Sequence, residues 1–472
     1  MPAETAQEPS SSDVSHISGK RPSGPSPAVL LVALALAVRL GLMVASHGMN
    51  FGFHERYTAY FQNETTNISA SIANGYGYSS PFLGVLFGDP KAGPTSWVAP
   101  IYPYFCAGIF RLFGVFSRES FFFIVLMQCI VSGLTCIPIL KVGEITVGRR
   151  AGLIAAFLWA VFPWFSQWAI TYIWEISLST LLFTTLFWFA LKLETSRSSR
   201  AWLGFGATWG FALLVNPSLL TLLPASLLWL GYRRRQMRLQ WLKPVLIAVV
   251  TCTVVTTPWL IRNRVVFGEW AFLRPNFPFE FWMANYHGST GRDWAGRHPT
   301  TNPEERAEYL RLGELAYVRE KAALDKKFVE QYPAEFTSLT AKRFLMFWDG
   351  STMKYHLPAA PYWLPWSFPC FSLLLLPGLV VAYLYRIRGW ELFWVALLLY
   401  PIPYYLTFNQ VRYRHAIEPL MLLLISFAVV AMADWFRGSI RHDGDVSLST
   451  PRKPPSLATG SAAVSPNPMR MR

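Results

Sequence analysis

Charged residues are scarce in this chain: Asp, Glu, Lys and Arg make up 15% of its 472 residues, whereas hydrophobic residues make up 53%. Soluble domains carry about 25% charged residues. Because so little charge leaves long apolar stretches uninterrupted, the composition excludes an ordinary soluble protein and predicts a polytopic membrane protein.

Paired cysteines and nucleotide-binding loops are also missing from the sequence. The five cysteines lie in or beside apolar segments, without the spacing of metal ligands or of a disulfide framework: Cys106, Cys129, Cys136, Cys252 and Cys370. No internal repeat and no glycine-rich phosphate loop occurs, so the sequence favours neither an ATP-driven pump nor a Rossmann-type enzyme.

The apolar runs are long enough to cross a membrane, since about 20 helical residues span a hydrocarbon core about 30 Å thick. We predict an all-α fold with about ten spans, near residues 28–47, 119–140, 151–166, 176–193, 201–215, 218–231, 241–260, 367–386, 390–408 and 415–436. The tails on either side of this membrane domain, residues 1–26 and 437–472, are rich in Ser, Pro and Gly, which predicts disorder.

Basic residues in the short loops gather on one predicted side of the membrane: Lys141, Arg149, Arg150, Lys192, Arg197, Arg200, Arg233, Arg234, Arg235, Arg238, Lys243, Arg386 and Arg388. Because such loops stay in the cytoplasm, we predict that both termini are cytoplasmic and that two large loops, residues 46–117 and 261–366, lie outside. The same rule lays residues 98–112 along the outer interface and divides residues 201–231 into two short helices at Asn216 and Pro217. The net charge of +15 then reflects loops and tails near anionic lipid, with no nucleic acid partner.

Shorter helices are predicted inside the two large loops. In the second loop, apolar residues recur at helical spacing over residues 303–330, and another helix follows over residues 333–347. In the first loop, Phe61, Glu64, Ile68 and Ile72 recur at intervals of three and four residues, which predicts a short helix ending at Gly75.

Glu64 is the first candidate for chemistry, because its carboxylate shares a helix face with Ile68 and Ile72. Burial on that face would raise the pKa of Glu64 and leave it able to accept a proton from an incoming hydroxyl, as a general base does. The alternative is an ordinary salt bridge or a helix-end carboxylate that faces water. Glu55, nearer the end of the first span, is a competing acid.

Four arginines lie at the outer ends of predicted spans, against the bias of the other short loops: Arg262, Arg264, Arg412 and Arg414. A planar guanidinium grips a phosphate with two hydrogen bonds, so this placement predicts phosphate clamps. For any single arginine, the alternative is that its long side chain reaches the interface only to keep its charge in water.

With these features the chain resembles the membrane-embedded GT-C glycosyltransferases, in particular the branch of protein O-mannosyltransferases and aminoarabinose transferases. The resemblance lies in a first span followed by a large outer loop, in NETTNISASIANGYGYS (residues 63–79), in the interfacial helix start that contains Tyr102, in residues 148–164 and in the late RYR at residues 412–414. It implies an inverting transfer of a sugar from a polyprenyl-phosphate donor to a lipid, glycan or protein acceptor on the outer face of the membrane.

The resemblance also implies roles for single residues. Glu64 matches the acidic catalytic residue of the first loop, and Asn63 stands where relatives often have a second acid, so we predict no cofactor and no metal, with a divalent metal as the open alternative. Lys91 is the nearest substitute for a phosphate-binding lysine. Trp174 and Glu175 fall where relatives place polar active-site residues, and we group them with Glu55 and Tyr102 as substrate-binding residues or secondary acids.

The prediction is therefore a polyprenyl-phosphate-sugar-dependent glycosyltransferase, integral to the plasma membrane of a bacterium. A transporter or lipid flippase is the rival class, but charges within the predicted spans are few and polar residues concentrate in the outer loops. A non-catalytic envelope-assembly factor on the same scaffold is the third class, because a fold alone does not establish an activity.

Overall fold

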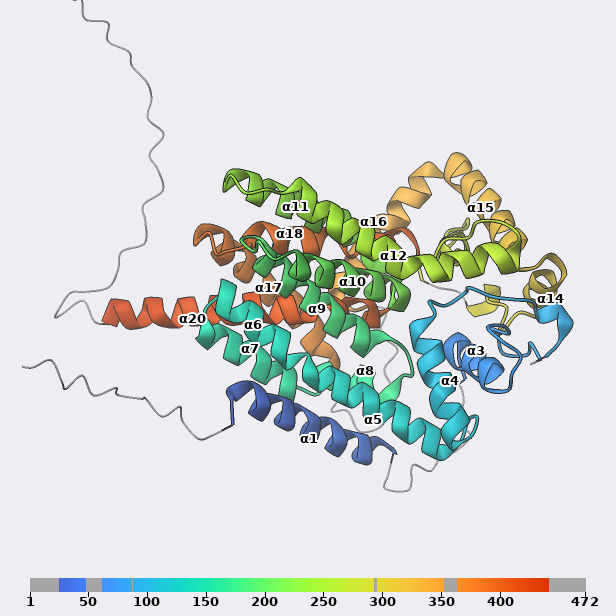
Figure 1. The fold of residues 1–472 in the computed structure, drawn as a ribbon, viewed down its shortest axis with the longest axis horizontal. Helices are drawn as coiled ribbons and strands as arrows, with labels where there is room; N and C mark the ends of the chain where they lie inside the picture. Colours follow the sequence, from blue (N-terminus) through green and yellow to red (C-terminus); the bar gives the residue numbers. More distant parts are fainter. Residues whose placement is uncertain (1–24, 48–61, 87, 293–294, 352–362, 441–472) are drawn as a thin grey trace, which may run out of the picture. The chain divides into compact units, whose positions relative to one another are not determined.

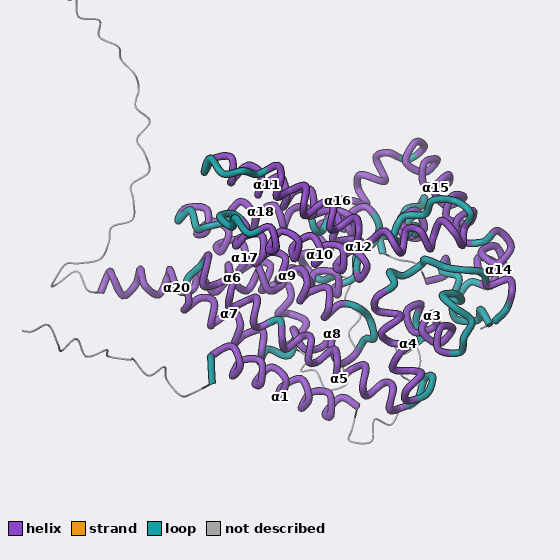
Figure 2. Tube along the Cα trace, viewed as in Figure 1, coloured by secondary structure: helices purple, strands orange, loops and turns teal. Residues whose placement is uncertain are grey.

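The structure, a computed structural model, describes residues 25–47, 62–86, 88–292, 295–351 and 363–440. Helices joined by loops make up this part of the chain (Figures 1 and 2), and its one bridge of strand type pairs Ser79 with Pro94. The chain divides into two compact units, Met1–Val430 and Ala431–Arg472, and the features below belong to the first unit unless stated. Glu55 and most of both predicted disordered tails lie outside the described residues.

Six helical segments of the described chain are long and apolar enough to cross a membrane. They are α1 (Pro27–His47), α5 with α6 (Arg118–Leu134 and Cys136–Thr146), α9 (Ile176–Leu193), α12 (Leu242–Phe267), η5 with α17 (Leu364–Trp366 and Ser367–Leu384), and η6 with α20 (Val411–Ile417 and Glu418–Ile440). These segments confirm an all-helical, membrane-integral protein.

A seventh crossing is formed if α7 (Arg149–Val161) and α8 (Trp164–Thr171) count as one span, bent by 44°. Pro163 breaks the helix because it has no N–H to continue the backbone ladder. The guanidinium of Arg39, on α1, takes over part of that role: its Nη2 and Nη1 donate to the carbonyl oxygens of Trp159 and Ala160 at 3.1 and 3.2 Å. Arg39 is fully buried, so this bend is held from inside the helix bundle.

The remaining predicted spans correspond to shorter helices. They are α10 (Ser199–Val215), η3 with α11 (Pro217–Leu222 and Leu223–Gln236), and α18 with α19 (Trp390–Leu399 and Ile402–Leu406). The predicted break at Asn216 and Pro217 is confirmed, since the Asn216 side chain caps η3 by accepting from the Ser218 N–H at 3.0 Å. Whether these shorter helices complete ten spans stays a prediction.

Helices α10 and α12 pack through glycine. Gly206 and Gly210 stand one turn apart on α10, and a Cβ on Gly206 would collide with the carbonyl oxygen of Ala248. On Gly210 it would lie 2.6 Å from the Cβ of Val255. Small residues four apart permit such close backbone approach between helices in a membrane.

The two large loops supply the remaining helices, which lie together at the end of the first unit opposite α11 and α18 (Figure 1). The first loop holds α3 (Glu64–Ala73), η2 (Pro90–Ala92) and α4 (Ile101–Phe113); the second holds α13 (Phe277–Ala284), η4 (Ala295–Arg297), α14 (Pro303–Leu312), α15 (Glu314–Gln331) and α16 (Pro333–Asp349). The helix predicted over residues 303–330 is divided at Gly313, whose φ of +77° interrupts the helical path.

A buried carboxylate joins the two loops. Glu314, the first residue of α15, accepts hydrogen bonds from the backbone N–H of Ser96 at 2.8 Å and from the hydroxyls of Thr95 and Tyr309. Because these donors satisfy the carboxylate inside the protein, the loops pack as one body above the ends of the spans.

Candidate active site

A cavity of about 590 Å³ lies between the two loops and the ends of the spans. Its acidic and basic lining residues come from five separate parts of the chain: Glu64, Glu175, Arg274, Glu280, His298 and Arg412. Aromatic and polar side chains fill the wall between them, including Tyr172, Trp174, Asn216, Asn276, Tyr400, Tyr404, Gln410 and Tyr413. This is where four of the predicted site residues meet: Glu64, Trp174, Glu175 and Arg412.

Glu64 stands at the first position of α3. Asn63 caps the helix, because its side-chain oxygen accepts from the Thr66 N–H at 3.2 Å while the Thr66 hydroxyl accepts from the Asn63 N–H at 3.0 Å. Ile68 and Ile72 are buried, as the shared face predicts, and Phe61 lies outside the described residues. The cap therefore fixes the start of α3, where the Glu64 side chain lines the cavity.

The sequence predicted that burial raises the pKa of Glu64, and this direction is wrong. Burial alone would raise it, but a hydrogen bond from His298 and the positive charge of Arg274 outweigh burial and leave the pKa of Glu64 below its usual value. The Nε2 atom of His298 lies 3.1 Å from Oε1 of Glu64. Glu64 thus lines the cavity, as a candidate base would, and is also paired with His298, as in the salt-bridge alternative.

Glu175 supplies a second carboxyl with a different character. It precedes α9, its side chain is buried, and its Oε2 atom has no hydrogen-bond partner among the described residues. Burial raises the pKa of Glu175 to about 7. At neutral pH this carboxyl therefore exchanges protons readily, which suits an acid or base.

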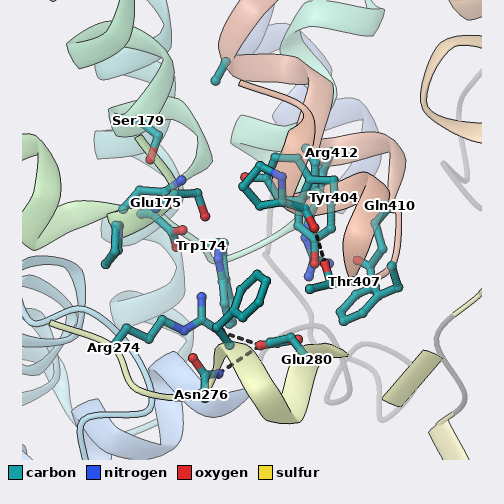
Figure 3. A pocket seen from close by; sticks show the side chains of 18 of the residues that line it. Trp174, Glu175, Ser179, Arg274, Asn276, Glu280, Tyr404, Thr407, Gln410 and Arg412 are labelled. Carbon is teal, nitrogen blue, oxygen red and sulfur yellow. Dashed lines mark hydrogen bonds and ion pairs between the residues drawn. The ribbon is translucent and has the colours of Figure 1, made fainter. Parts of the chain in front are cut away.

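An ion pair that the sequence did not reveal borders the same cavity. The Nη2 atom of Arg274 lies 2.8 Å from Oε1 of Glu280, and the Asn276 amide donates to the same oxygen at 2.9 Å. Arg274 also donates to the carbonyl of Trp97 at 2.8 Å, which anchors it to the first loop. Figure 3 shows Arg274, Asn276 and Glu280 grouped together, with Trp174 between this group and Glu175.

Arg412 projects from η6 toward the cavity (Figure 3). Its guanidinium lies over the rings of Tyr172, Tyr413 and Trp174, at 4.7, 5.2 and 5.6 Å from their centroids. Its Nε atom is buried and has no hydrogen-bond partner among the described residues. A cation held by aromatic faces, with a donor still to be satisfied, suits an incoming anion.

The other predicted phosphate ligands do not line this cavity. Arg414 is fully buried, where its Nε donates to Glu418 at 3.1 Å. Arg262 donates to the carbonyls of Thr95 and Tyr78, so it connects α12 to the first loop. Neither guanidinium lines the cavity, and both hydrogen-bond to groups of the protein.

Three further predictions also fall outside the cavity. Arg264 is exposed and donates to the carbonyl of Gly268, and Lys91 is exposed on η2. Tyr102 is buried on α4 with its hydroxyl bonded to Gln128. Arg264 and Lys91 therefore face solvent and the Tyr102 hydroxyl is satisfied inside the protein, so none of the three lines the cavity.

His298 and Arg274 are the site residues that sequence reasoning missed. Their segments, RPNFPFE (residues 274–280) and GRHPTTNP (residues 296–303), carry no helical periodicity. The signal that could have indicated them is a charged or titratable side chain set between Pro and Gly residues in a large loop. Among the described residues, no three His, Cys, Asp or Glu side chains come together as metal ligands, and the absence of a metal stays a prediction.

Comparison with known proteins places the fold. Residues 97–261 match the family model described as dolichyl-phosphate-mannose-protein mannosyltransferase. The oligosaccharyltransferase AglB of Archaeoglobus fulgidus, solved with an inhibitory peptide and a dolichol-phosphate, aligns with a TM-score of 0.52 at 13% identity, covering 89% of this chain and 52% of its own. Its apo form aligns with the same TM-score at 12% identity, covering 89% and 53%.

The structure thus has the GT-C fold of membrane glycosyltransferases, which confirms the resemblance seen in the sequence. The chain spans about half the length of the archaeal enzyme. ArnT of Cupriavidus metallidurans bound to undecaprenyl phosphate aligns at 15% identity over 86% of this chain and 78% of its own, with a TM-score of 0.38. No curated protein sequence matched the chain.

Proposed function

We propose that this protein is a membrane glycosyltransferase that moves a sugar from a polyprenyl-phosphate donor to a lipid, glycan or protein acceptor. The observation that carries the proposal is one cavity that holds a carboxylate paired with an imidazole, Glu64 with His298, and an arginine, Arg412, whose Nε atom has no hydrogen-bond partner among the described residues. The archaeal enzyme of the same fold was solved with a dolichol-phosphate, which supports a lipid phosphate as the donor class.

In the proposed reaction, Glu64 takes the proton of the acceptor hydroxyl while the acceptor oxygen forms a bond to the anomeric carbon. The bond from that carbon to the phosphate oxygen breaks, and its electron pair leaves with the polyprenyl phosphate. Arg412 balances the charge that gathers on the phosphate. A single displacement of this kind inverts the anomeric centre. Glu175, with a pKa of about 7, is the secondary acid that can protonate the departing phosphate.

The proposed orientation places the cavity on the extracytoplasmic side of a bacterial plasma membrane and both termini in the cytoplasm. Three of the predicted inner loops meet at Glu194, which follows α9: Arg233 and Arg388 approach its two carboxylate oxygens at 2.8 and 2.7 Å. Glu175 stands at the opposite end of this 18-residue helix, about 27 Å away at 1.5 Å per residue. The basic loops and the cavity therefore occupy opposite ends of a span, as the orientation requires.

The test is sugar transfer by the purified full-length protein in lipid vesicles, offered a panel of labelled polyprenyl-phosphate sugars. The Glu64→Gln variant is compared with wild type and with Glu335→Gln, whose carboxylate pairs with His287 outside the cavity. Transfer that is lost with Glu64→Gln and kept with Glu335→Gln supports the proposal. A folded wild type that consumes no donor overturns it and favours a transporter or an assembly factor.

A further inference from the structure

His298 reaches Glu64 from the second loop. Its imidazole stands between two aromatic rings, edge-on to Phe82 at 5.3 Å and to Phe279 at 5.6 Å between centroids. The Nε2 atom lies 3.1 Å from Oε1 of Glu64, and 16% of the His298 side chain is exposed. Because T-shaped contacts with these two rings restrict the imidazole, it has little freedom to turn away from the carboxylate.

The hydrogen-bond pattern selects one tautomer of His298. The backbone N–H of Thr300 donates to Nδ1 at 3.2 Å, so Nδ1 carries a lone pair and the neutral ring carries its hydrogen on Nε2. That hydrogen points at Glu64. The turn is itself closed by the N–H groups of Thr301 and Asn302, which donate to the His298 carbonyl at 2.9 and 2.8 Å.

The preceding residue fixes this turn to α13. Arg297 donates to the carbonyl of Trp282 at 2.8 Å, and its guanidinium lies 3.7 Å from the centroid of the Trp282 ring and 4.6 Å from that of Tyr286. An arginine that is both stacked and hydrogen-bonded is a rigid attachment. The position of His298 is therefore set by the packing of the second loop.

We propose that His298 is a positioning residue for Glu64: its Nε2–H holds one carboxylate oxygen and turns the other toward the acceptor hydroxyl. This inference rests on the proposed function, in which Glu64 is the base. The first loop then supplies the base and the second loop supplies the residue that orients it. A productive site therefore requires the two loops to be packed together.

Removing the imidazole should affect the chemical step more than binding. We expect His298→Ala to lower kcat roughly ten- to a hundredfold, the worth of a hydrogen bond to a charged group, with the KM for the lipid donor unchanged. His298→Gln should restore most of the rate, since its amide nitrogen stands as many bonds from Cα as Nε2 does. Combined with Glu64→Gln, His298→Ala should cause no additional loss, because it acts through Glu64.

The pH profile supplies a readout that a merely structural role would not move. The ionisable groups around Glu64 are His298, Arg274, Arg412, Glu280 and Tyr172. Losing the hydrogen bond from His298 removes a contribution that lowers the pKa of Glu64, so the acid-side inflection of kcat should move to higher pH in His298→Ala.

His287→Ala is the matched control, since His287 also pairs with a glutamate, Glu335, at 3.0 Å but is 73% exposed and lies outside the cavity. It should keep the wild-type rate and pH profile.

If the wild type is active and His298→Ala changes neither kcat nor the acid-side inflection of its pH profile, this inference alone is overturned. An additional loss of rate in the double variant also overturns it. If His298→Ala fails to fold, a His298→Gln rate at the wild-type level supports the inference and a rate below about a tenth of wild type overturns it. A wild type inactive with every donor overturns the proposed function instead.

Discussion

Arg412 and Arg414 stand two residues apart on η6, yet only Arg412 borders the cavity, and Arg414 is buried against Glu418. In a 3₁₀ turn successive residues are about 120° apart, so positions i and i+2 face different directions. The two arginines that read alike in the sequence therefore have separate roles, one open to a ligand and one internal.

Arg412 should govern use of the lipid donor. We expect Arg412→Ala to raise the KM for the polyprenyl-phosphate donor roughly tenfold or more, because a charge-assisted hydrogen bond to the phosphate is lost. Arg264→Ala, at an exposed arginine outside the cavity, should leave that KM unchanged. Initial rates measured against donor concentration decide the matter, and equal effects of the two variants would contradict the role given to Arg412.

Arg414 should matter for stability. Arg414→Ala leaves Glu418 without its arginine in a fully buried position and removes donors to Ser372 and the Phe368 carbonyl, which should cost about 3 kcal/mol. Arg437→Ala breaks an exposed pair with Asp434 in the part of α20 that belongs to the second unit, and should cost less than about 1 kcal/mol. Thermal unfolding in detergent compares the two, and equal melting temperatures would refute the prediction.

Glu64→Gln should nearly abolish transfer without unfolding the protein. General-base catalysis contributes about 10²- to 10⁴-fold, and an amide accepts no proton while it keeps the size of the side chain. Turnover of labelled donor and the melting temperature are measured together. Near-normal turnover in a folded Glu64→Gln protein would exclude Glu64 as the base.

Glu175 should make stability depend on pH. Its usual pKa of 4.5 rises to about 7 in the folded protein, so between these values the folded state holds a proton that the unfolded state has released. Stability must then fall as pH rises through this window, by at most about 3 kcal/mol from this group. Glu175→Gln should flatten the fall in melting temperature between pH 5 and pH 8, whereas Glu330→Gln, at an exposed position of α15, should not. Identical slopes in wild type and Glu175→Gln would count against a raised pKa.

The glycine contact between α10 and α12 offers a test of the packing. Gly206→Ala places a methyl group against the backbone of Ala248 and should cost about 1 to 3 kcal/mol. Gly204→Ala, on the same helix with no described residue within 4 Å of its added Cβ, should be neutral or slightly stabilising. Melting temperatures that fall equally in both variants would show that the close approach is absent.

Most of the helical framework could be predicted from the sequence, because membrane spans and breaks leave local signals. Apolar runs marked the long helices, and Asn216 with Pro217 marked a break. Glu64 could be selected for the same reason, since the spacing to Ile68 and Ile72 is a local property.

The partners in the site could not be predicted, because they depend on how the two loops pack. His298 is distant from Glu64 in sequence, and without that contact burial predicted the wrong direction for the pKa of Glu64. The sequence predicts a phosphate clamp at Arg262, whereas its guanidinium donates to the carbonyls of Tyr78 and Thr95 in the folded chain. Long-range hydrogen bonds of this kind have no signature in local periodicity.

The arginine of α1 that holds the bend between α7 and α8 also bears on how the chain is assembled. A charged residue near the middle of an isolated helix makes membrane insertion less favourable by about 3 kcal/mol. Apart from the Ala35 carbonyl within α1, the hydrogen-bond partners of Arg39, among them the hydroxyl of Ser132 and the carbonyls of Trp159 and Ala160, are synthesised more than ninety residues later. We therefore expect the first helix to be a weaker anchor during translation, and to reach its full stability in the bilayer only after α5 and α7 have been synthesised.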